Sequence, residues 1–349
     1  MEEFGPEARS PRAGQIGGAG IDMNNQLRPM ALGEILDRTA ELYRNHFLLF
    51  AGISAIFAGI MLAVQLLYVR SLVLLGYPNM MAHFQWGTAS GAVLEALVIL
   101  MLAGLSIAAN NRAVDWVYLD KSASIRTAAK SVLPRLRTYL WLMTITGFRA
   151  WAPFAALYIA FIAVAFTVLP HDFMTNPTAI QGAVQHNPGA IMAAGLGMLV
   201  LSPFFILALV YGTWMSLRYS LAVPACVVEG LPATGAIQRS IQLSQGSRGR
   251  IFVLGLLVYA VRMLLGILFG FPLIALAVKH PGHPLPVGWL MFQQVGVFVS
   301  SSLIGPIYSI GLTLFYYDQR IRKEGFDIEW MMHAAGLSPQ PELAEPRNS

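Results

Sequence analysis

Charged residues and cysteine are both scarce in this sequence. Asp, Glu, Lys and Arg make up 12% of its 349 residues, and 56% are hydrophobic, whereas an ordinary soluble domain has about 25% charged residues. A water-soluble fold of this composition would have too few polar side chains to cover its surface. Cys226 is the one cysteine, which excludes an internal disulfide and a metal site built from several cysteines.

Recognisable catalytic motifs are also missing. The sequence contains neither HExxH, a zinc-binding pattern, nor GxSxG, the nucleophile pattern of hydrolases. His280 and His283 fall in a short turn, and the glycine-rich residues 14–21 precede no strand-to-helix unit, so neither metal nor nucleotide binding is supported. The basic segments are short and are explained by membrane topology, which argues against nucleic acid. We therefore expect no enzymatic activity, catalytic residue, cofactor, metal or nucleic-acid partner.

The two ends of the sequence differ from the rest. Residues 1–30 have no apolar stretch of the kind that a secretory signal needs, so we expect the first hydrophobic run to direct its own insertion. Their Gly, Pro and charged residues predict a disordered cytoplasmic tail. Residues 333–349 are expected to form a second such tail. The interpretation leaves one membrane domain at residues 31–332.

Six long hydrophobic runs dominate the middle of the sequence. A helix needs about 20 apolar residues to cross a hydrocarbon core of about 30 Å. Runs of this length predict an all-α, polytopic integral membrane protein with six transmembrane helices, at residues 47–69, 88–110, 139–168, 189–214, 251–279 and 287–317. Gly266 and Gly270 form a GxxxG pair in the fifth run, which predicts a helix-packing face.

The basic residues lie on alternate connections. Nineteen of the 23 Lys and Arg residues precede the first run, separate the second from the third, or follow the fourth and the sixth. The other connections hold just Arg70 and Lys279, and two more arginines lie inside runs. Because basic residues stay on the cytoplasmic side, this distribution predicts a multi-pass protein of the bacterial inner membrane with both termini cytoplasmic.

Three basic, amphipathic segments precede pairs of hydrophobic runs. They lie at residues 32–49, 124–142 and 236–254, and each is expected to form an interfacial helix on the membrane surface. This order predicts a threefold internal repeat of one interfacial helix and one two-helix hairpin, with units at about residues 31–115, 116–225 and 226–325. The alternative is that each segment arose independently, because a basic helix before a span is useful by itself.

Polar residues inside the hydrophobic runs form the first candidate site. Arg149 and Arg262 each lie twelve residues after another arginine that opens the same run, about 18 Å into the membrane. Glu95 and Gln293 fall at comparable depths. One hypothesis is a polar centre of these four residues that holds an anionic lipid head group or couples a conformational change to charge. The alternative is structural: Glu95 pairs with one arginine, and the other extends toward water or phosphate.

The last run ends in charged residues, which suggests a cytoplasmic membrane exit. Tyr316 and Tyr317 are interpreted as interfacial aromatic residues, and residues 326–336 as a short surface helix; the alternative is a solvated linker. Basic residues near the surface would contact anionic lipid head groups, each contributing about 1 kcal/mol. The residues expected to make such contacts are Arg38, Lys130, Arg239, Arg320, Arg322 and Lys323.

Four stretches of the sequence resemble a known family. Residues 32–50, 117–136, 224–252 and 314–329 are together similar to the bacterial glycerophosphoryl diester phosphodiesterase membrane-domain family. The resemblance covers about residues 30–332 and implies six spans with cytoplasmic termini. Some members carry a soluble phosphodiesterase after the membrane domain. The few residues after Met332 leave no room for that domain, so we do not expect its activity here.

The sequence thus predicts a membrane protein without a catalytic site. The leading hypothesis is a non-enzymatic membrane scaffold or lipid-associating module, whose partners are anionic membrane lipids and an unknown protein. The alternative is a small transporter, channel or lipid-translocating protein that uses the intramembrane polar centre. The second hypothesis depends on Arg149, Arg262 and Glu95, whereas the first depends on the basic surface helices.

Overall fold

A computed structural model of the chain describes residues 29–74, 86–118, 121–168, 188–279 and 286–325. The described residues are helical, with no strand among them, which confirms the all-α prediction. The predicted tails at 1–30 and 333–349, apart from residues 29 and 30, and the predicted helix at 326–336 lie outside the described residues.

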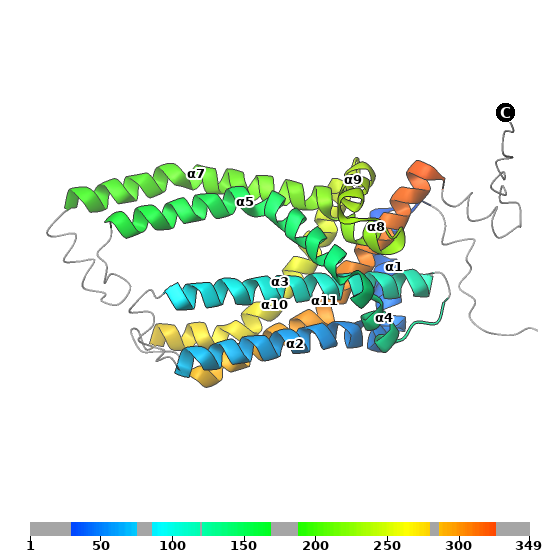
Figure 1. The fold of residues 1–349 in the computed structure, drawn as a ribbon, viewed down its shortest axis with the longest axis horizontal. Coiled ribbons are helices and arrows are strands. Elements are labelled where there is room, and N and C mark those ends of the chain that lie inside the picture. The colour runs from blue at the N-terminus through cyan, green and yellow to red at the C-terminus, as the bar shows by residue number, and fades with distance from the viewer. Residues whose placement is uncertain (1–28, 75–85, 119–120, 169–187, 280–285, 326–349) are drawn as a thin grey trace, which may run out of the picture.

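Long helices form the body of the molecule. They are α2 (Phe47–Leu74), α3 (Trp86–Tyr118), α5 (Leu136–Val168), α7 (Pro188–Tyr219), α10 (Arg248–Lys279) and α11 (Val287–Glu324). Shorter elements are α1 (Leu32–Asn45), α4 (Ile125–Ser131), a 3-10 turn (Leu133–Arg135), α8 (Ala222–Val228) and α9 (Ala233–Ser244). In Figure 1 the long helices extend along the long axis, and the short ones gather at one end of the bundle.

Five described segments are long and apolar enough to cross a membrane. They are Phe47–Ser71, Leu97–Tyr118, Gly195–Val228, Arg248–Lys279 and Val287–Glu324. The predicted span at residues 139–168 corresponds to α5, a helix of 33 residues that is not one of these five. The structure therefore supports a multi-pass membrane protein, and the sixth span stays a prediction.

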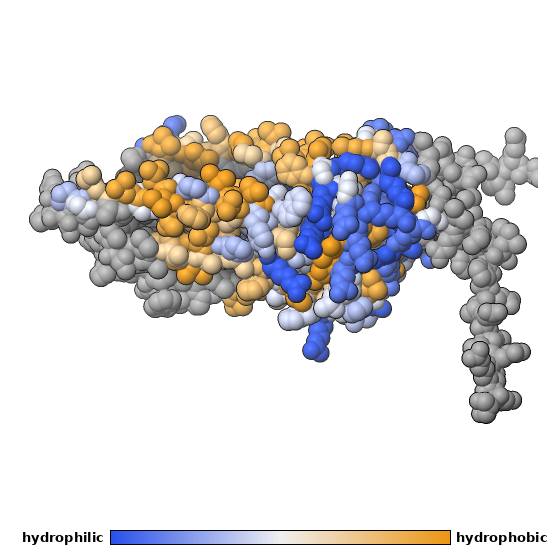
Figure 2. All heavy atoms as spheres, turned by 90° about the horizontal axis from the view of Figure 1, so that it is seen from above, coloured by the Kyte–Doolittle hydropathy of each residue, from blue (hydrophilic) through white to orange (hydrophobic). Residues whose placement is uncertain are grey.

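The surface divides into an apolar part and a polar part. Many side chains on the long helices are apolar and exposed, such as Leu207, Leu264 and Phe271. Figure 2 shows hydrophobic residues over the larger part of the molecule and hydrophilic residues gathered at one end, where the short helices lie. We call this second region the polar end. The division is expected for helices that expose apolar side chains to lipid.

The long helices form two groups. α11 packs along α2 and α10, α2 also packs along α3, and α5 pairs with α7, as Figure 1 shows. Glycine allows close approach at two places on α11. A Cβ atom added to Gly311 would lie 2.6 Å from Leu254, and one added to Gly296 would lie 2.5 Å from Phe269 Cβ. At these two positions a side chain of α10 occupies the space that a side chain on α11 would need.

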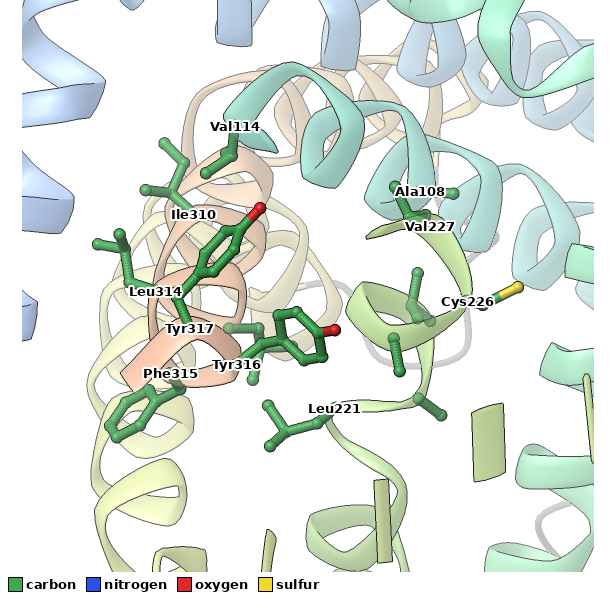
Figure 3. Close-up of a cluster of buried hydrophobic side chains, with 14 of the residues drawn as sticks. Ala108, Val114, Leu221, Cys226, Val227, Ile310, Leu314, Phe315, Tyr316 and Tyr317 are labelled. Atoms are coloured by element: carbon green, nitrogen blue, oxygen red, sulfur yellow. The ribbon is translucent and has the colours of Figure 1, made fainter. Parts of the chain in front are cut away.

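The hydrophobic core lies at the polar end. Its fully buried members include Ile35 of α1, Leu221 and Cys226 beside or within α8, and Phe315 of α11, several of which are drawn in Figure 3. The apolar faces of α1 and α9 thus pack onto the ends of the long helices. Because these faces are occupied by protein, the amphipathic pattern of both segments is explained by packing as well as by a membrane surface.

Three times along the chain, a short helix is followed by two long helices. The short helix α1 precedes α2 and α3, α4 precedes α5 and α7, and α9 precedes α10 and α11. This order is the one that the predicted repeat requires. The threefold repeat itself, with units at about 31–115, 116–225 and 226–325, stays a prediction.

Candidate functional site

Asp318 of α11 is the centre of a charged cluster at the polar end. Its side chain is 0% exposed and lies between two arginines: Arg250 Nη2 is 3.3 Å and Arg322 Nε is 2.9 Å from its carboxylate oxygens. The backbone N–H of Met30 donates to the same carboxylate at 2.8 Å, and both arginines donate to the backbone oxygen of Met30. A buried carboxylate with this many donors is a structural anchor, since its charge is neutralised on every side.

Glu229 and Arg239 form a second charged cluster at the polar end. Arg239 of α9 donates from Nε to Glu229, which follows α8, at 2.8 Å, and from Nη2 to Glu324 of α11 at 2.7 Å. Burial alone would lower the pKa of Arg239, but the hydrogen bonds and charges of the two carboxylates raise that pKa above its usual value. Tyr316 donates to the same Glu229 at 2.5 Å. The cluster therefore joins α8, α9 and α11.

Lys323 caps the C-terminal end of α9. Its ammonium group donates to the backbone oxygens of Gln242, Leu243 and Gln245 at 2.7, 3.1 and 2.9 Å. The last carbonyl groups of a helix have no partner within the helix and carry partial negative charge, so a lysine is a favourable cap there. Lys323 therefore fixes α9 to α11.

Most of the cations expected to contact lipid head groups bind the protein itself. Arg239, Arg322 and Lys323 do so as described above. Arg38 pairs with Glu41 at 2.7 Å, and Arg320 with Glu324 at 3.2 Å. Lys130 is exposed and has no hydrogen bond or ion pair with any residue that the structure describes. Contact with lipid head groups stays a prediction for all six residues.

Tyr316 and Tyr317 lie in the core rather than at an interface with lipid. They are 0% and 1% exposed, and Figure 3 shows both rings among buried side chains. Tyr317 donates to Asp115 of α3 at 2.5 Å and stacks on Tyr118, with ring centroids 4.8 Å apart. Their hydroxyl groups are satisfied by carboxylates from distant segments, so these tyrosines join helices.

Arg262 lines a hollow of about 310 Å³ that lies between α2, α3, α10 and α11. Its Nη2 donates to Ser301 Oγ at 3.0 Å, and no described carboxylate pairs with it. The polar side chains around this first hollow are Ser54, Ser106, Tyr259, Arg262, Ser301, Tyr308 and Ser309. The guanidinium group thus has hydroxyl neighbours but no counter-charge among the described residues.

A second hollow of about 120 Å³ adjoins the first at Arg262. Gln293 and Ser300 of α11 line it. The Oγ atoms of Ser300 and Ser309 are buried and have no hydrogen-bond partner among the described residues. An unsatisfied buried polar group costs about 1–3 kcal/mol. Each hollow therefore contains a polar atom that a bound ligand could satisfy.

The predicted polar centre is divided by the fold. Arg262 and Gln293 line the same hollow. Glu95 of α3 lies close enough to Tyr68 of α2 to influence it electrostatically, and Arg149 is exposed on α5. Among the described residues, neither Glu95 nor Arg149 has an ion-pair partner. The neighbours of Arg262 are therefore serine and tyrosine hydroxyl groups, whereas the sequence suggested a carboxylate.

Sequence analysis did not identify Asp115, Glu229 or Asp318 as functional or structural centres. A usable indication was present, because each carboxylate follows or interrupts an apolar stretch and would be costly there without a partner. Comparison with known proteins adds no family: no family model, no curated protein and no solved structure matches this chain.

Proposed function

We propose that this chain is a non-enzymatic integral membrane protein that binds anionic lipid through the Arg262 hollow. It would cross the bacterial inner membrane six times, with α5 as the sixth span, three interfacial helices, a threefold repeat and both termini in the cytoplasm. The alternating basic connections support this orientation. The chain would then be a member of the family that its sequence resembles, the glycerophosphoryl diester phosphodiesterase membrane-domain family.

The position of Arg262 carries the proposal. The residue lies fourteen positions after Arg248, where α10 begins, which is about 21 Å along the helix. A charge at this depth costs about 2.5–3.5 kcal/mol on insertion scales unless it has a partner or a polar cavity. A guanidinium group also matches the geometry of a phosphate oxygen pair. A phospholipid phosphate beside Arg262 would supply the counter-charge and acceptors for the nearby hydroxyl groups.

The composition of the two hollows supports binding rather than catalysis. The described polar residues that line them are serines, two tyrosines, a glutamine and Arg262. None of these lining residues is a carboxylate or an imidazole that could act as a general base near neutral pH.

A scaffold role is the second candidate, and the charged clusters favour it. Asp318, Glu229 and Lys323 fix α8, α9, α10 and α11 to one another at the polar end. A face held this firmly would present a constant surface to a protein partner. Capture of one defined partner, lost on neutralising exposed Lys130 but not Arg262, would favour the scaffold.

The test of lipid binding compares two arginines. Wild-type protein, Arg262→Gln and Arg149→Gln are purified in mild detergent, and retained phosphatidylglycerol is counted by native mass spectrometry. We expect Arg262→Gln to weaken retention about tenfold or more, because each hydrogen bond to a charged group contributes about 1.5–3 kcal/mol. Arg149→Gln should behave as wild type. Equal retention by wild type and Arg262→Gln would contradict the proposal.

A further inference from the structure

Three hollows follow one another along the contact between α10 and α11. The first and second share Arg262. The second shares Gly266 and Gln293 with a third hollow of about 490 Å³, which Leu273 and Ala277 also line. Shared lining residues place the hollows next to one another, so they form one interrupted groove. We call this series the α10–α11 groove.

The groove is long enough to pass through a membrane. Its lining on α10 begins at Gly255 and ends at Ala277. These 22 positions correspond to about 33 Å of helix, and the hydrocarbon core of a bilayer is about 30 Å thick. A binding pocket for one lipid at one depth would need only a part of this length.

Polar side chains recur along the groove on one face of α11. The positions are 293, 300, 301, 308 and 309, occupied by Gln, Ser, Ser, Tyr and Ser, and all five residues line a hollow. Intervals of seven and eight residues return to the same face of a helix after two turns. From Gln293 to Ser309 the stripe is about 24 Å long, and Arg262 faces it from α10 near the middle.

The borders of the groove are apolar and open to the surroundings. Leu256, Met263, Leu264 and Ile267 of α10 are exposed by 53%, 54%, 67% and 50%. Side chains of this kind accommodate lipid acyl chains, while hydroxyl and guanidinium groups accommodate a phosphate. The α10–α11 groove therefore offers a polar path beside an apolar surface, over most of the bilayer.

We propose that the α10–α11 groove conducts the head group of an anionic phospholipid between the two leaflets, while its acyl chains stay in the bilayer. The phosphate passes from Gln293 to Arg262 and on to Ser309, exchanging one set of donors for the next. The inference rests on the proposed lipid binding and extends it, because binding needs Arg262 alone and transfer needs the whole groove. Gly266, at the junction of the second and third hollows, is therefore the place to test.

The experiment blocks the groove without removing a polar group. A Cβ atom added to Gly266 has nothing within 4 Å, and Gly266 lines the second and third hollows, so the side chain of Gly266→Leu would enter the groove. Gly195 of α7 is equally unobstructed and lines none of the three hollows, which makes Gly195→Leu the matched control. The full-length proteins are reconstituted into phosphatidylethanolamine and phosphatidylglycerol vesicles that contain fluorescent phosphatidylglycerol. Dithionite added outside then reports how fast inner-leaflet probe reaches the outer leaflet.

We expect wild type and Gly195→Leu to transfer the probe faster than protein-free vesicles do. Gly266→Leu should slow the transfer about tenfold, equivalent to about 1.4 kcal/mol of added barrier. Retention of phosphatidylglycerol by wild type and Arg262→Gln is measured in parallel by native mass spectrometry. A wild-type rate equal to that of protein-free vesicles, or a Gly266→Leu rate equal to wild type, would overturn the inference.

Two further measurements separate the possible failures. If Arg262-dependent lipid retention persists without transfer, lipid binding stands and the groove as a path is wrong. If neither is observed, both proposals fail. Inorganic phosphate is offered to the same vesicles as a soluble source of the same chemical group. Phosphate uptake that Gly266→Leu abolishes, without any transfer of the lipid probe, would overturn the lipid path in favour of a solute path.

Discussion

Arg322 of α11 donates a 2.7 Å hydrogen bond to the backbone oxygen of Met30, a residue 292 positions earlier in the chain. Arg250 of α10 donates to the same oxygen at 2.8 Å. The backbone N–H of Met30 is bound in turn by Asp318. Both polar groups of one peptide segment are therefore held by side chains from the last two long helices. This arrangement fixes the start of α1 against α10 and α11.

Asp318→Asn should destabilise the protein. The substitution keeps the size of the side chain and removes the buried negative charge between Arg250 and Arg322. Removing one partner of a buried ion pair costs about 3–5 kcal/mol, and we expect about 3 because Arg322 is 38% exposed. The loss should be measured as the free energy of unfolding in mild detergent. Asp37→Asn is the control, because Asp37 is exposed on α1, and an equal effect of both changes would argue against the anchor.

Gly296→Ala should also destabilise the protein. A methyl group there would lie 2.8 Å from Phe269 Cδ1 and closer still to the base of the same side chain, so α10 and α11 would have to separate. Overpacking of this kind costs about 1–3 kcal/mol. Gly266→Ala is the matched control, since it adds a methyl group in open space and gains about 1 kcal/mol of helix propensity. Thermal unfolding midpoints that move in the same direction for both variants would contradict the close contact at Gly296.

The predicted orientation can be tested by cysteine labelling. The native thiol of Cys226 is buried, so introduced cysteines report with little background. Asn176→Cys, in the connection between α5 and α7, should react with a membrane-impermeant maleimide added to intact spheroplasts. Lys121→Cys, in the exposed connection after α3, should react only after the membrane is opened. The reverse pattern would place the polar end outside the cell.

The hydrophobic runs predicted the long helices well but stopped too early at the polar end. The second run was expected to end at residue 110 and the last at residue 317, whereas α3 continues to Tyr118 and α11 to Glu324. Both extensions contain charged residues that ended the hydropathy pattern. They remain helical because their polar groups pair across the helices, as Tyr317 does with Asp115. Such partners come from distant segments, so a single run cannot reveal them.

The sequence placed Arg262 and Gln293 at related levels of their helices, and both line one hollow, but it did not predict which neighbours Glu95 and Arg149 would face. The position of a residue along a span follows from counting, which brought Arg262 and Gln293 to related levels. The side of the bundle that a helix faces depends on its neighbours, and the fold placed Glu95 beside Tyr68 instead of an arginine. Gly266 illustrates the same limit: its GxxxG pattern predicted close packing, yet the residue borders open space.

The basic residues of α9 and α11 show the same limit of sequence-based prediction. Their positive charge predicted lipid contacts because each was judged by its own segment. In the structure Arg239 meets Glu229 and Glu324, while Lys323 meets carbonyl groups of α9. The sequence identified these cations as a group, but the partners of each one follow only from the three-dimensional arrangement.

The packing of α11 against α2 constrains the order in which the protein is assembled. A ribosome makes α11 after every other described helix, so the earlier helices are complete while their central neighbour is still missing. Until it arrives, the backbone of Met30 lacks the carboxylate of Asp318 and the guanidinium group of Arg322, and Arg250 of α10 is left to hold it. Nascent chains halted before α11 would thus lack the contacts that fix the start of α1, and we expect them to be digested by an added protease faster than the complete chain.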